Sequence, residues 1–574
     1  MKNNIIVKKL ILLILFCFLS VIFILPLVKT NIIFYGDDLI FQLHRILEMV
    51  TNFKNGNLFI GIYTYTFHSI GYPLNLFYPW VTLLPFIFFG LLVKNSVIAI
   101  YIGIAFYTFL TLTFTYWTTK KFSNNNLQSF MTAIIYTFCS YRTIDIYARF
   151  ALGEFIALTF LPLCVYGLYA IVLGNSKDWP FLGFGMSFVL LSHLLSVVLY
   201  AIFLLLLFII FITYKKITKR RNRVIDLGKA ILISILSSAI FWIPFLEQET
   251  YQKISQPDKM DMVAQALLPS KVIMESLNNN LTRGDAGNTY NIGIILFLAI
   301  IIGIAQYKDW DKNYKIIYFL GIVFLFVSTS LLPWNLIEKT PLSIIQFPWR
   351  FLTISSYLLS LVAGHECYIL ISIIATSYYR RIIVILVLSV ITIVPWYAGI
   401  TNFKNPVNNN EKFALATFTP RGVNYTDSGK KVEPALYHLG DYAPIDGTKK
   451  LPEIISKNAS INGKKFTLKK TIVKPNEIEF NNSKFKNSRN ITLPIFAYRN
   501  LKVYNKNDQE LFYKVNSYRQ IVVGKTNNSN LIKVKYQMSN LDKFSVVTSM
   551  LTWIIGVISF VRKKGLGSLK KAKF

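Results

Sequence analysis

Long apolar runs separated by short polar segments dominate the chain. Each run approaches the ~20 apolar residues with which an α-helix crosses the hydrocarbon core of a bilayer. Twelve runs fit this description, at residues 10–30, 96–117, 128–141, 155–173, 179–193, 195–214, 228–246, 291–307, 314–332, 349–375, 382–398 and 544–561. The pattern predicts an α-helical polytopic membrane protein with about 12 transmembrane helices. The runs 128–141 and 179–193 are short, so we expect them to recruit flanking residues.

One further run, 76–93, contains Pro79 and Pro85, which favour a broken helix. If this run crossed the membrane, the basic segment 215–223 would face outward. If it re-enters or lies at the interface, every basic cluster faces the cytoplasm, as the positive-inside rule requires. We therefore expect twelve spanning helices in the cell membrane, with both termini cytoplasmic and the first run retained as an anchor.

This topology divides the chain into inner and outer parts. The outer face receives four polar loops, at residues 31–95, 142–154, 247–290 and 333–348. A later outer region alternates apolar and polar residues in stretches such as "KKFTLKKTIV" and "SYRQIVVGK", which is typical of an antiparallel β-sandwich. We expect a transmembrane domain with outer loops at 1–400, an extracellular β-rich domain at 401–543, and a last transmembrane helix with a basic cytoplasmic tail at 544–574.

Composition agrees with a membrane protein and argues against a nucleic-acid-binding protein and against cysteine-based disulfide or zinc sites. Of the 574 residues, 53% are hydrophobic, and the mean hydropathy is +0.46. The formal charge of +33 is spread over many loops rather than gathered in one basic module, so we expect no nucleic-acid partner. The four cysteines all lie in apolar runs without paired spacing, which argues against disulfides and a zinc site.

The outer loops carry the polar residues that are candidates for chemistry. They are Asp37, Asp38, His44 and Arg45 in the first loop, Arg149 and Glu154 in the second, and Gln346 and Arg350 in the fourth, together with His193 inside an apolar run. Ionisable groups near a bilayer are costly, so they indicate function by default.

Each of these residues also has a structural explanation. The two aspartates can cap a helix, because Asp is favoured at that position. His44 and Arg45 can form the polar face of an interfacial helix. Arg149 and Glu154 can be a structural ion pair, with Arg142 and Asp145 adding to it. His193 can be a hydrogen-bonded core histidine, and Arg350 can extend toward the interface.

Together these residues suit group transfer from a lipid-borne phosphate donor. An acceptor hydroxyl needs a carboxylate to take its proton, and a donor phosphate needs arginines that bind it through two hydrogen bonds. A polyprenyl tail needs an apolar groove between helices. No P-loop, GxSxG, HExxH or Rossmann fingerprint is present, so soluble nucleotide chemistry has no support.

Several stretches carry a resemblance to a known family. "GDDLIFQLHRI", "GYPLNLFYPW", "YRTIDIYARFALGEFIALTFLPL", "LLSHLLS" and "IQFPWRFL" resemble the signature stretches of the bacterial 6-pyruvoyl-tetrahydropterin-synthase-related membrane proteins. The similarity covers most of the chain. The layout is also similar to that of GT-C glycosyltransferases, including oligosaccharyltransferase-like members, so the resemblance implies a GT-C-like transmembrane domain.

The resemblance assigns roles to individual residues. Asp38 matches the family's D-x-x-F aspartate and Arg45 its R-I arginine. Arg149 and Glu154 match R-x-x-x-x-E, and Gln346 and Arg350 match Q-F-P-W-R. Where many relatives have Phe-His-Leu, this chain has "FQL", so a role for that histidine would fall to His44.

We therefore predict an inverting membrane glycosyltransferase that moves a sugar from a polyprenyl-phosphate donor to a cell-envelope acceptor at the extracellular face. Asp38 is the predicted general base, with Asp37 or Glu154 assisting or holding a divalent cation. The predicted donor-phosphate ligands are Arg149, Arg350 and Arg45, and the supporting residues are His44, His193 and Gln346.

The partners follow from the same interpretation. They are the polyprenyl-phosphate sugar, membrane lipid and an anionic wall polymer such as teichoic acid, which the basic outer domain would attract. Alternatively, the lysines only keep a β-rich domain soluble and its edges unpaired. The competing functions are a non-catalytic transporter of lipid-linked polymer and a cell-wall scaffold. The absence of an internal repeat and the outer position of the acidic residues disfavour transport.

Overall fold

The chain forms two compact units, each assembled from separated stretches of sequence. The computed structural model describes residues 2–30, 33, 36–214, 218–257, 259–282, 289–404 and 439–570. As far as these residues extend, the first unit contains Met1–Gln42, Phe88–Ala230 and Lys259–Val432. The second unit contains Leu43–Ile87, Ile231–Asp258 and Glu433–Phe574.

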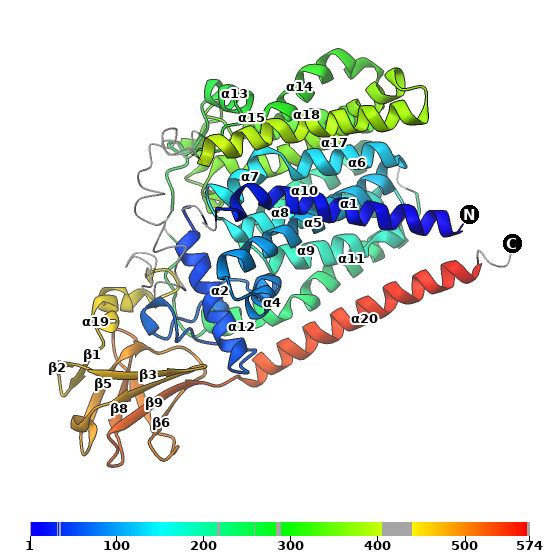
Figure 1. Cartoon of the computed structure of the whole chain (residues 1–574). Coiled ribbons are helices and arrows are strands. Elements are labelled where there is room, and N and C mark those ends of the chain that lie inside the picture. The colour runs from blue at the N-terminus through cyan, green and yellow to red at the C-terminus, as the bar shows by residue number, and fades with distance from the viewer. Residues whose placement is uncertain are drawn as a thin grey trace. The chain divides into compact units, whose positions relative to one another are not determined.

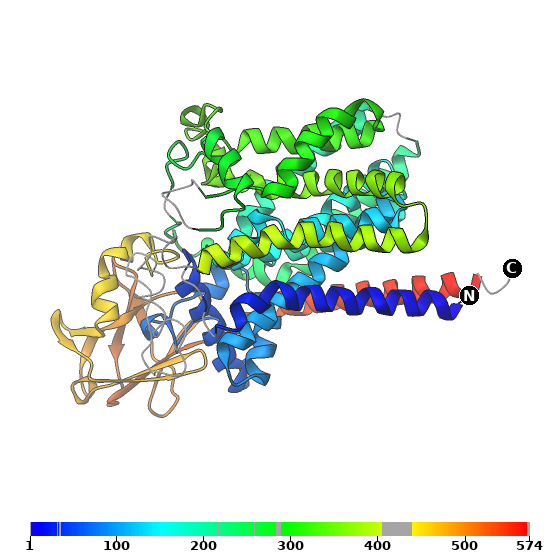
Figure 2. The same ribbon diagram turned by 45° about the horizontal axis from the view of Figure 1, so that its top comes forward.

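Helices make up the first unit (Figure 1). They are α1 (Lys2–Val28), α5 (Ser96–Ser123), α6 (Asn126–Thr137), α7 (Ser140–Tyr147), α8 (Leu152–Val172), α9 (Pro180–Leu190), α10 (Leu194–Tyr214), α13 (Pro269–Leu277), α14 (Ile294–Gln306), α15 (Lys312–Val327), α16 (Trp334–Ile337), α17 (Leu352–Ile374) and α18 (Tyr378–Lys404). Helix α5 packs against α1, α6 and α8, and α17 packs against α6, α14 and α15. These helices run side by side in both views (Figures 1 and 2).

The helices support the membrane assignment. Among the described residues, seven helices are long and apolar enough to cross a bilayer, and an eighth span would be the bent pair α11 (Arg220–Ser237) and α12 (Ala239–Glu249), which meet at 67°. Four predicted runs instead form the shorter helices α6, α9, α14 and α15, of 11 to 16 residues. The count of twelve spans and the orientation of the termini therefore stay predictions.

The run 76–93 is broken, as its prolines predicted. It contains the end of α3 (Leu74–Phe77), a 3₁₀ turn at Val81–Leu83 and the helix α4 (Leu84–Leu92). The connection between α3 and the turn includes Pro79, whose missing N–H cannot continue a helix. No helix of spanning length forms in this run.

The C-terminal strands of the second unit form two antiparallel sheets. The strands are β1 (Asn458–Ile461), β2 (Lys464–Thr467), β3 (Lys470–Lys474), β4 (Glu477–Asn481), β5 (Arg489–Phe496), β6 (Leu501–Asn505), β7 (Tyr513–Val515), β8 (Gln520–Lys525) and β9 (Leu531–Tyr536), preceded by the short helix α19 (Leu451–Ile455). One sheet has the order β2-β1-β5-β8-β7 and the other the order β3-β4-β9-β6. Alternate residues of β6 and β9 are buried, which matches the predicted β-rich region. Residues 405–438, the first part of the predicted outer domain, lie outside the described residues.

The last helix, α20 (Asn540–Lys570), belongs to the second unit and packs against α12. Its Ser549 hydroxyl accepts a hydrogen bond from the Ile240 N–H at 2.7 Å, and Trp553 donates to the Ser237 carbonyl at 3.0 Å. These groups bridge the break between α11 and α12, where the backbone ladder of a continuous helix is interrupted.

Within the second unit, a buried carboxylate binds the backbone of the first outer loop. Glu48, on α2 (Leu39–Lys54), is fully buried. Its oxygens accept the backbone N–H groups of Thr64, Tyr65 and Thr66 at 2.7–3.3 Å and the Thr66 hydroxyl at 3.0 Å. The segment just beyond, Phe67 to Ser69, has left-handed φ angles of 50–56°. Such a strained turn persists only where its surroundings fix it, and Glu48 supplies part of that fixation.

We expect Glu48→Ala to lower the free energy of unfolding by about 3 kcal/mol or more, because it leaves several buried N–H groups without an acceptor. The measurement is the thermal unfolding of the full chain in detergent. Glu510→Ala is the matched control, since Glu510 is exposed and pairs with the half-exposed Lys502. Equal unfolding temperatures for the two variants would contradict this role of Glu48.

Candidate functional site

The two aspartates of the first loop are docked on the backbone of the second loop. The Asp38 N–H donates to the Arg149 carbonyl at 3.0 Å. A Cβ atom on Gly36 would lie only 2.5 Å from the carbonyl carbon and oxygen of Arg149. Glycine at this position therefore permits the close approach that brings Asp37 and Asp38 to the second loop.

Arg149 lies between two carboxylates. Its Nη1 donates to Asp145 Oδ1, one helical turn earlier, and to Glu154 Oε2 at 3.0 Å. All three side chains are more than nine-tenths buried. Taking a guanidinium out of water is costly unless carboxylates compensate its charge. The three side chains therefore form a single ion-paired group.

Glu154, in the first turn of α8, joins several elements at one point. Its Oε1 accepts the Tyr141 hydroxyl of α7 at 2.6 Å and the Thr353 hydroxyl of α17 at 3.4 Å. Its Oε2 lies 3.6 Å from Arg350 Nε in addition to its bond with Arg149. We call Asp145, Arg149, Glu154 and Arg350 the charge cluster. Its position is fixed by α7, α8 and the start of α17.

Arg350 is held by the turn that precedes it. Its Nη1 donates to the Ile345 carbonyl at 2.7 Å and to Gln346 Oε1 at 3.0 Å. Gln346 has a φ of +65°, a left-handed conformation that is unusual for a residue other than glycine. Gln346 and Arg350, the two motif residues of "QFPWR", are therefore in direct contact.

An aromatic stack supports both arginines. Trp349 stacks on Tyr290 at 4.0 Å and on Phe347 at 4.6 Å between ring centroids. Arg149 lies 4.2 Å from the Trp349 ring centroid, and Arg350 lies 4.7 Å from that of Phe347. Cation–π contacts of this kind hold guanidinium planes in a fixed orientation.

Asp38 differs electrostatically from the other carboxylates. It is half-buried, and no hydrogen bond to its carboxylate is present among the residues that the structure describes. Burial raises the pKa of Asp38 to about 6, while the charges of Arg149 and Arg350 oppose the shift and those of Asp37 and Glu154 add to it. The carboxylate therefore titrates near neutral pH, where a general base is most effective.

The cluster retains donors for an anion. In the described part of the chain, Nε of Arg149 and Nε of Arg350 are buried without a hydrogen-bond partner. Each guanidinium has five N–H donors, and the hydrogen bonds described above use only Nη1, although Nε of Arg350 also lies 3.6 Å from Glu154 Oε2. A phosphate oxygen is the type of acceptor that such donors favour.

The remaining predicted residues are not members of the charge cluster. His193, between α9 and α10, pairs its Nδ1 with the Ser196 hydroxyl at 2.9 Å. His44 and Arg45 belong to the second unit. His44 Nδ1 accepts the Phe67 N–H at 3.4 Å, and the buried Arg45 donates to the Pro79 carbonyl and lies 4.3 Å from the Tyr78 ring centroid. Their functional roles stay predictions from the sequence.

The described residues do not fit the divalent cation considered from the sequence. Nowhere in the ranges given above do three or more His, Cys, Asp or Glu side chains gather so that they could hold a metal ion. Glu154, the second proposed ligand, already contacts Arg149, Tyr141 and Arg350. We therefore derive no step that passes through a metal.

Sequence reasoning missed several residues of this site. Gly36 had a signal, because a glycine directly before two candidate aspartates suggests a close approach. Trp349 and Phe347 lie near Arg350 in "QFPWR", but the motif alone does not indicate that they stack against the arginines. Tyr141, Tyr290 and Thr353 come from separate segments and gave no signal of a shared site.

Comparison with known proteins gives little further information. No family model matches the chain, and no curated protein matches it by sequence. Among solved structures, the archaeal oligosaccharyltransferase AglB from Archaeoglobus fulgidus, in complex with an inhibitory peptide and a dolichol-phosphate, is similar with a TM-score of 0.39 and 14% identity. The match covers 74% of this chain and 60% of that one, so the chain spans less than two thirds of that protein. At this distance the comparison assigns no residue, substrate or activity, and the resemblance to the pterin-synthase-related family stays a prediction.

We expect Gly36→Ala to disturb the docking of the first loop and to cost about 1–3 kcal/mol, the usual range for overpacking a tight contact. Thermal unfolding of the full chain in detergent measures the loss. Gly228→Ala is the control, because nothing lies within 4 Å of its added Cβ and alanine favours the helix α11. A Gly36→Ala variant as stable as Gly228→Ala would contradict the close approach.

Proposed function

We propose that the chain is a membrane glycosyltransferase that uses a polyprenyl-phosphate sugar as its donor. The observation that carries the proposal is the combination of Asp38, a carboxylate that titrates near pH 6 and has no described hydrogen bond, with two buried arginines that keep unused donors. A base and an oxyanion site at one place are the two requirements of sugar transfer from a phosphate.

The proposed reaction is a single displacement with inversion. The acceptor hydroxyl gives its proton to the Asp38 carboxylate as its oxygen attacks the anomeric carbon of the donor sugar. The bond between that carbon and the phosphate oxygen breaks, and its electron pair leaves with the polyprenyl phosphate. Arg149 and Arg350 stabilise the negative charge that develops on this oxygen.

The other members of the cluster have positioning roles in this proposal. Glu154 and Asp145 orient Arg149, and Gln346 orients Arg350. Asp37 is exposed next to Asp38 and raises its pKa by charge repulsion. We leave His44 and Arg45 out of the mechanism, because their described contacts hold the first loop together.

For the acceptor, we propose a hydroxyl group of a cell-envelope polymer. The β-rich region was expected to attract an anionic polymer such as teichoic acid. Many of its lysines lie against carboxylates, including Lys474 with Glu479, Lys502 with Glu510 and Lys533 with Asp508. This pairing reduces the free positive charge and favours the alternative that the lysines keep the sheets soluble.

The first test is sugar transfer by the purified full chain with undecaprenyl-phosphate sugars. We expect Asp38→Asn to lower kcat by about 10²–10⁴-fold, the contribution typical of a general base. We expect Arg350→Gln to lower kcat by about 10²–10³-fold, as for loss of an oxyanion donor.

Asp309→Asn is the matched control for this test, because Asp309 is an exposed carboxylate in the turn after α14. Full activity of Asp38→Asn would overturn its assignment as base. Movement of labelled lipid-linked sugar across proteoliposomes without any transfer would favour the transporter instead.

The pH dependence provides a second test. The base must be ionised, so kcat should fall below about pH 6, the pKa of Asp38. Because the charge of Asp37 raises that pKa, Asp37→Asn should move the acidic limb of the profile to lower pH while transfer persists. The measurement is kcat between pH 4.5 and 8. If Asp37→Asn leaves the acidic limb at the same pH, the group that produces this limb is not Asp38.

A further inference from the structure

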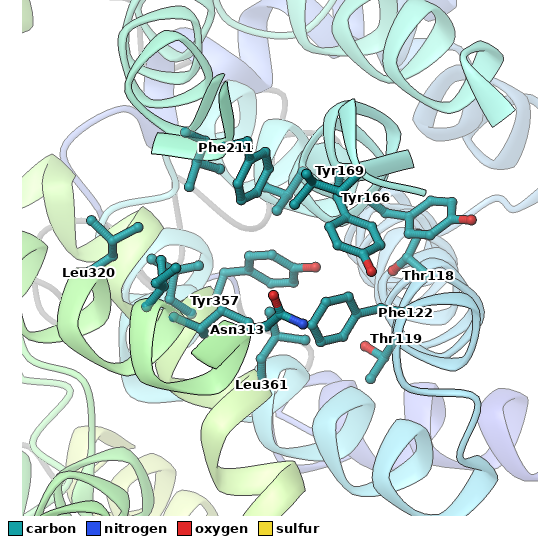
Figure 3. Close-up of a pocket in the computed structure, with 16 residues that line it drawn as sticks. Thr118, Thr119, Phe122, Tyr166, Tyr169, Phe211, Asn313, Leu320, Tyr357 and Leu361 are labelled. Atoms are coloured by element: carbon teal, nitrogen blue, oxygen red, sulfur yellow. The ribbon is translucent and has the colours of Figure 1, made fainter. Parts of the chain in front are cut away.

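A cavity in the first unit extends from the end of α8 that is remote from Glu154 toward the middle of the helices. It is lined by residues of α5, α8, α10, α15 and α17, and ten of them are labelled in Figure 3. Along α8, Glu154 lies in the first turn, whereas Tyr166, Tyr169 and Leu173 reach the cavity. A helix of 21 residues is about 30 Å long, so the Leu173 side of the cavity lies at the far end of α8 from Glu154, whereas its inner end at Tyr357 is one turn of α17 from Thr353, which binds Glu154.

The exposure of the lining residues shows where the cavity opens. Its inner part consists of buried side chains, among them Leu320, Tyr357 and Leu361. Of the half-buried lining residues, Leu173 and Asn313 lie at helix ends, whereas others, such as Val165 and Ile316, lie within α8 and α15. The cavity is therefore open at the helix ends and partly along the sides of these helices, and it extends inward among the helices of the first unit.

The cavity is mostly apolar but contains an unused polar group. The Thr119 hydroxyl is buried and has no hydrogen-bond partner among the described residues (Figure 3). The Tyr166 hydroxyl at the wall is already bonded to Asp178 at 2.7 Å. A ligand here would bury a hydrocarbon chain and meet one free hydroxyl along its path.

The mouth of the cavity is strongly basic. The segments 118–124, 173–178, 218–223 and 307–315, all described, carry ten basic and three acidic residues. Two of the basic residues are fixed near the mouth. Lys121 binds Asp178, the partner of Tyr166, at 2.7 Å, and Arg223 donates to the carbonyls of Ile171 and Gly174 at 2.6 and 3.1 Å. This charge complements an anionic headgroup.

The size of the cavity selects one class of chain. Its enclosed volume is about 60 Å³, and the space reaches about 680 Å³ only when the open side and its solvent are included. Part of a hydrocarbon chain therefore lies inside the cavity and the rest lies along its open side. A slender unbranched acyl chain suits this narrow space better than a polyprenyl chain, whose methyl branches make it bulkier.

We propose that this cavity binds one acyl chain of an anionic phospholipid from the leaflet at this end of the bundle, with the headgroup held by the basic mouth. The lipid is a bound component distinct from the donor of the proposed transfer reaction. Lys121, Arg223 and Lys312 surround the headgroup, and Thr119 faces the chain. The inference does not depend on the activity proposed for the charge cluster.

Native mass spectrometry of the full chain in detergent tests this proposal. The probes are phosphatidylglycerol, phosphatidylcholine with the same acyl chains, and undecaprenyl phosphate. We expect one phosphatidylglycerol to be retained per chain and phosphatidylcholine to be retained at least tenfold less. Equal retention of the two phospholipids, or preferential retention of undecaprenyl phosphate at this cavity, would overturn the proposal.

Two variants, each with a control, locate the bound lipid. Leu361→Trp fills the inner part of the cavity and should reduce phosphatidylglycerol retention at least tenfold. Leu205→Trp is the control, because Leu205 is 60% exposed on α10. Lys312→Gln should reduce retention about fivefold, the effect of one surface charge on an anionic lipid. If Leu361→Trp does not fold, the phosphatidylglycerol retention of Lys312→Gln is compared with that of its control, Lys339→Gln. Unchanged retention in the folded cavity and mouth variants would contradict the site.

Discussion

The burial of the Arg149 guanidinium between two carboxylates is the constraint on which the rest of the site depends. A charge in a low-dielectric environment must be paired, and Asp145 and Glu154 supply the pairs from α7 and α8. Glu154 also binds Thr353 of α17 and lies close to Arg350, so one carboxylate fixes several elements. The first loop then docks on the backbone of Arg149 itself, which brings Asp38 to the same place.

In the proposed reaction, the burial that makes the cluster costly also strengthens its interaction with the donor. Donors held in a low-dielectric environment interact strongly with a charge that develops beside them and need no reorganisation when it appears. The stack of Tyr290, Trp349 and Phe347 restricts both guanidiniums further. The Asp38 carboxylate has no hydrogen bond among the described residues, and with a pKa of about 6 it can accept and release a proton near neutral pH.

Much of this arrangement could be predicted from the sequence. Apolar runs gave the spanning helices, and alternation gave the strands of the C-terminal sheets, because both patterns follow from the period of the backbone. Arg149, Glu154, Gln346 and Arg350 were chosen as ionisable or polar residues of the outer loops, and the structure brings them together.

Other features could not be predicted, because they depend on packing between distant segments. Thr353 and Tyr141 meet at Glu154 although more than two hundred residues separate them along the chain. The assignment of His44 and Arg45 to a unit that also contains the C-terminal strands had no local signal. The cavity between α5, α8, α10, α15 and α17 arises from side chains whose sequence pattern is that of ordinary membrane helices.

The central claim is that the donor phosphate lies on the two arginines with its sugar beside Asp38. A cryo-electron microscopy structure of the full chain with a phosphonate analogue of a polyprenyl-phosphate sugar tests this most directly. The account predicts phosphonate oxygens within hydrogen-bond distance of both Arg149 and Arg350, and the Asp38 carboxylate facing the anomeric carbon. A phosphonate bound away from both arginines, with Asp38 remote from the sugar, would contradict it.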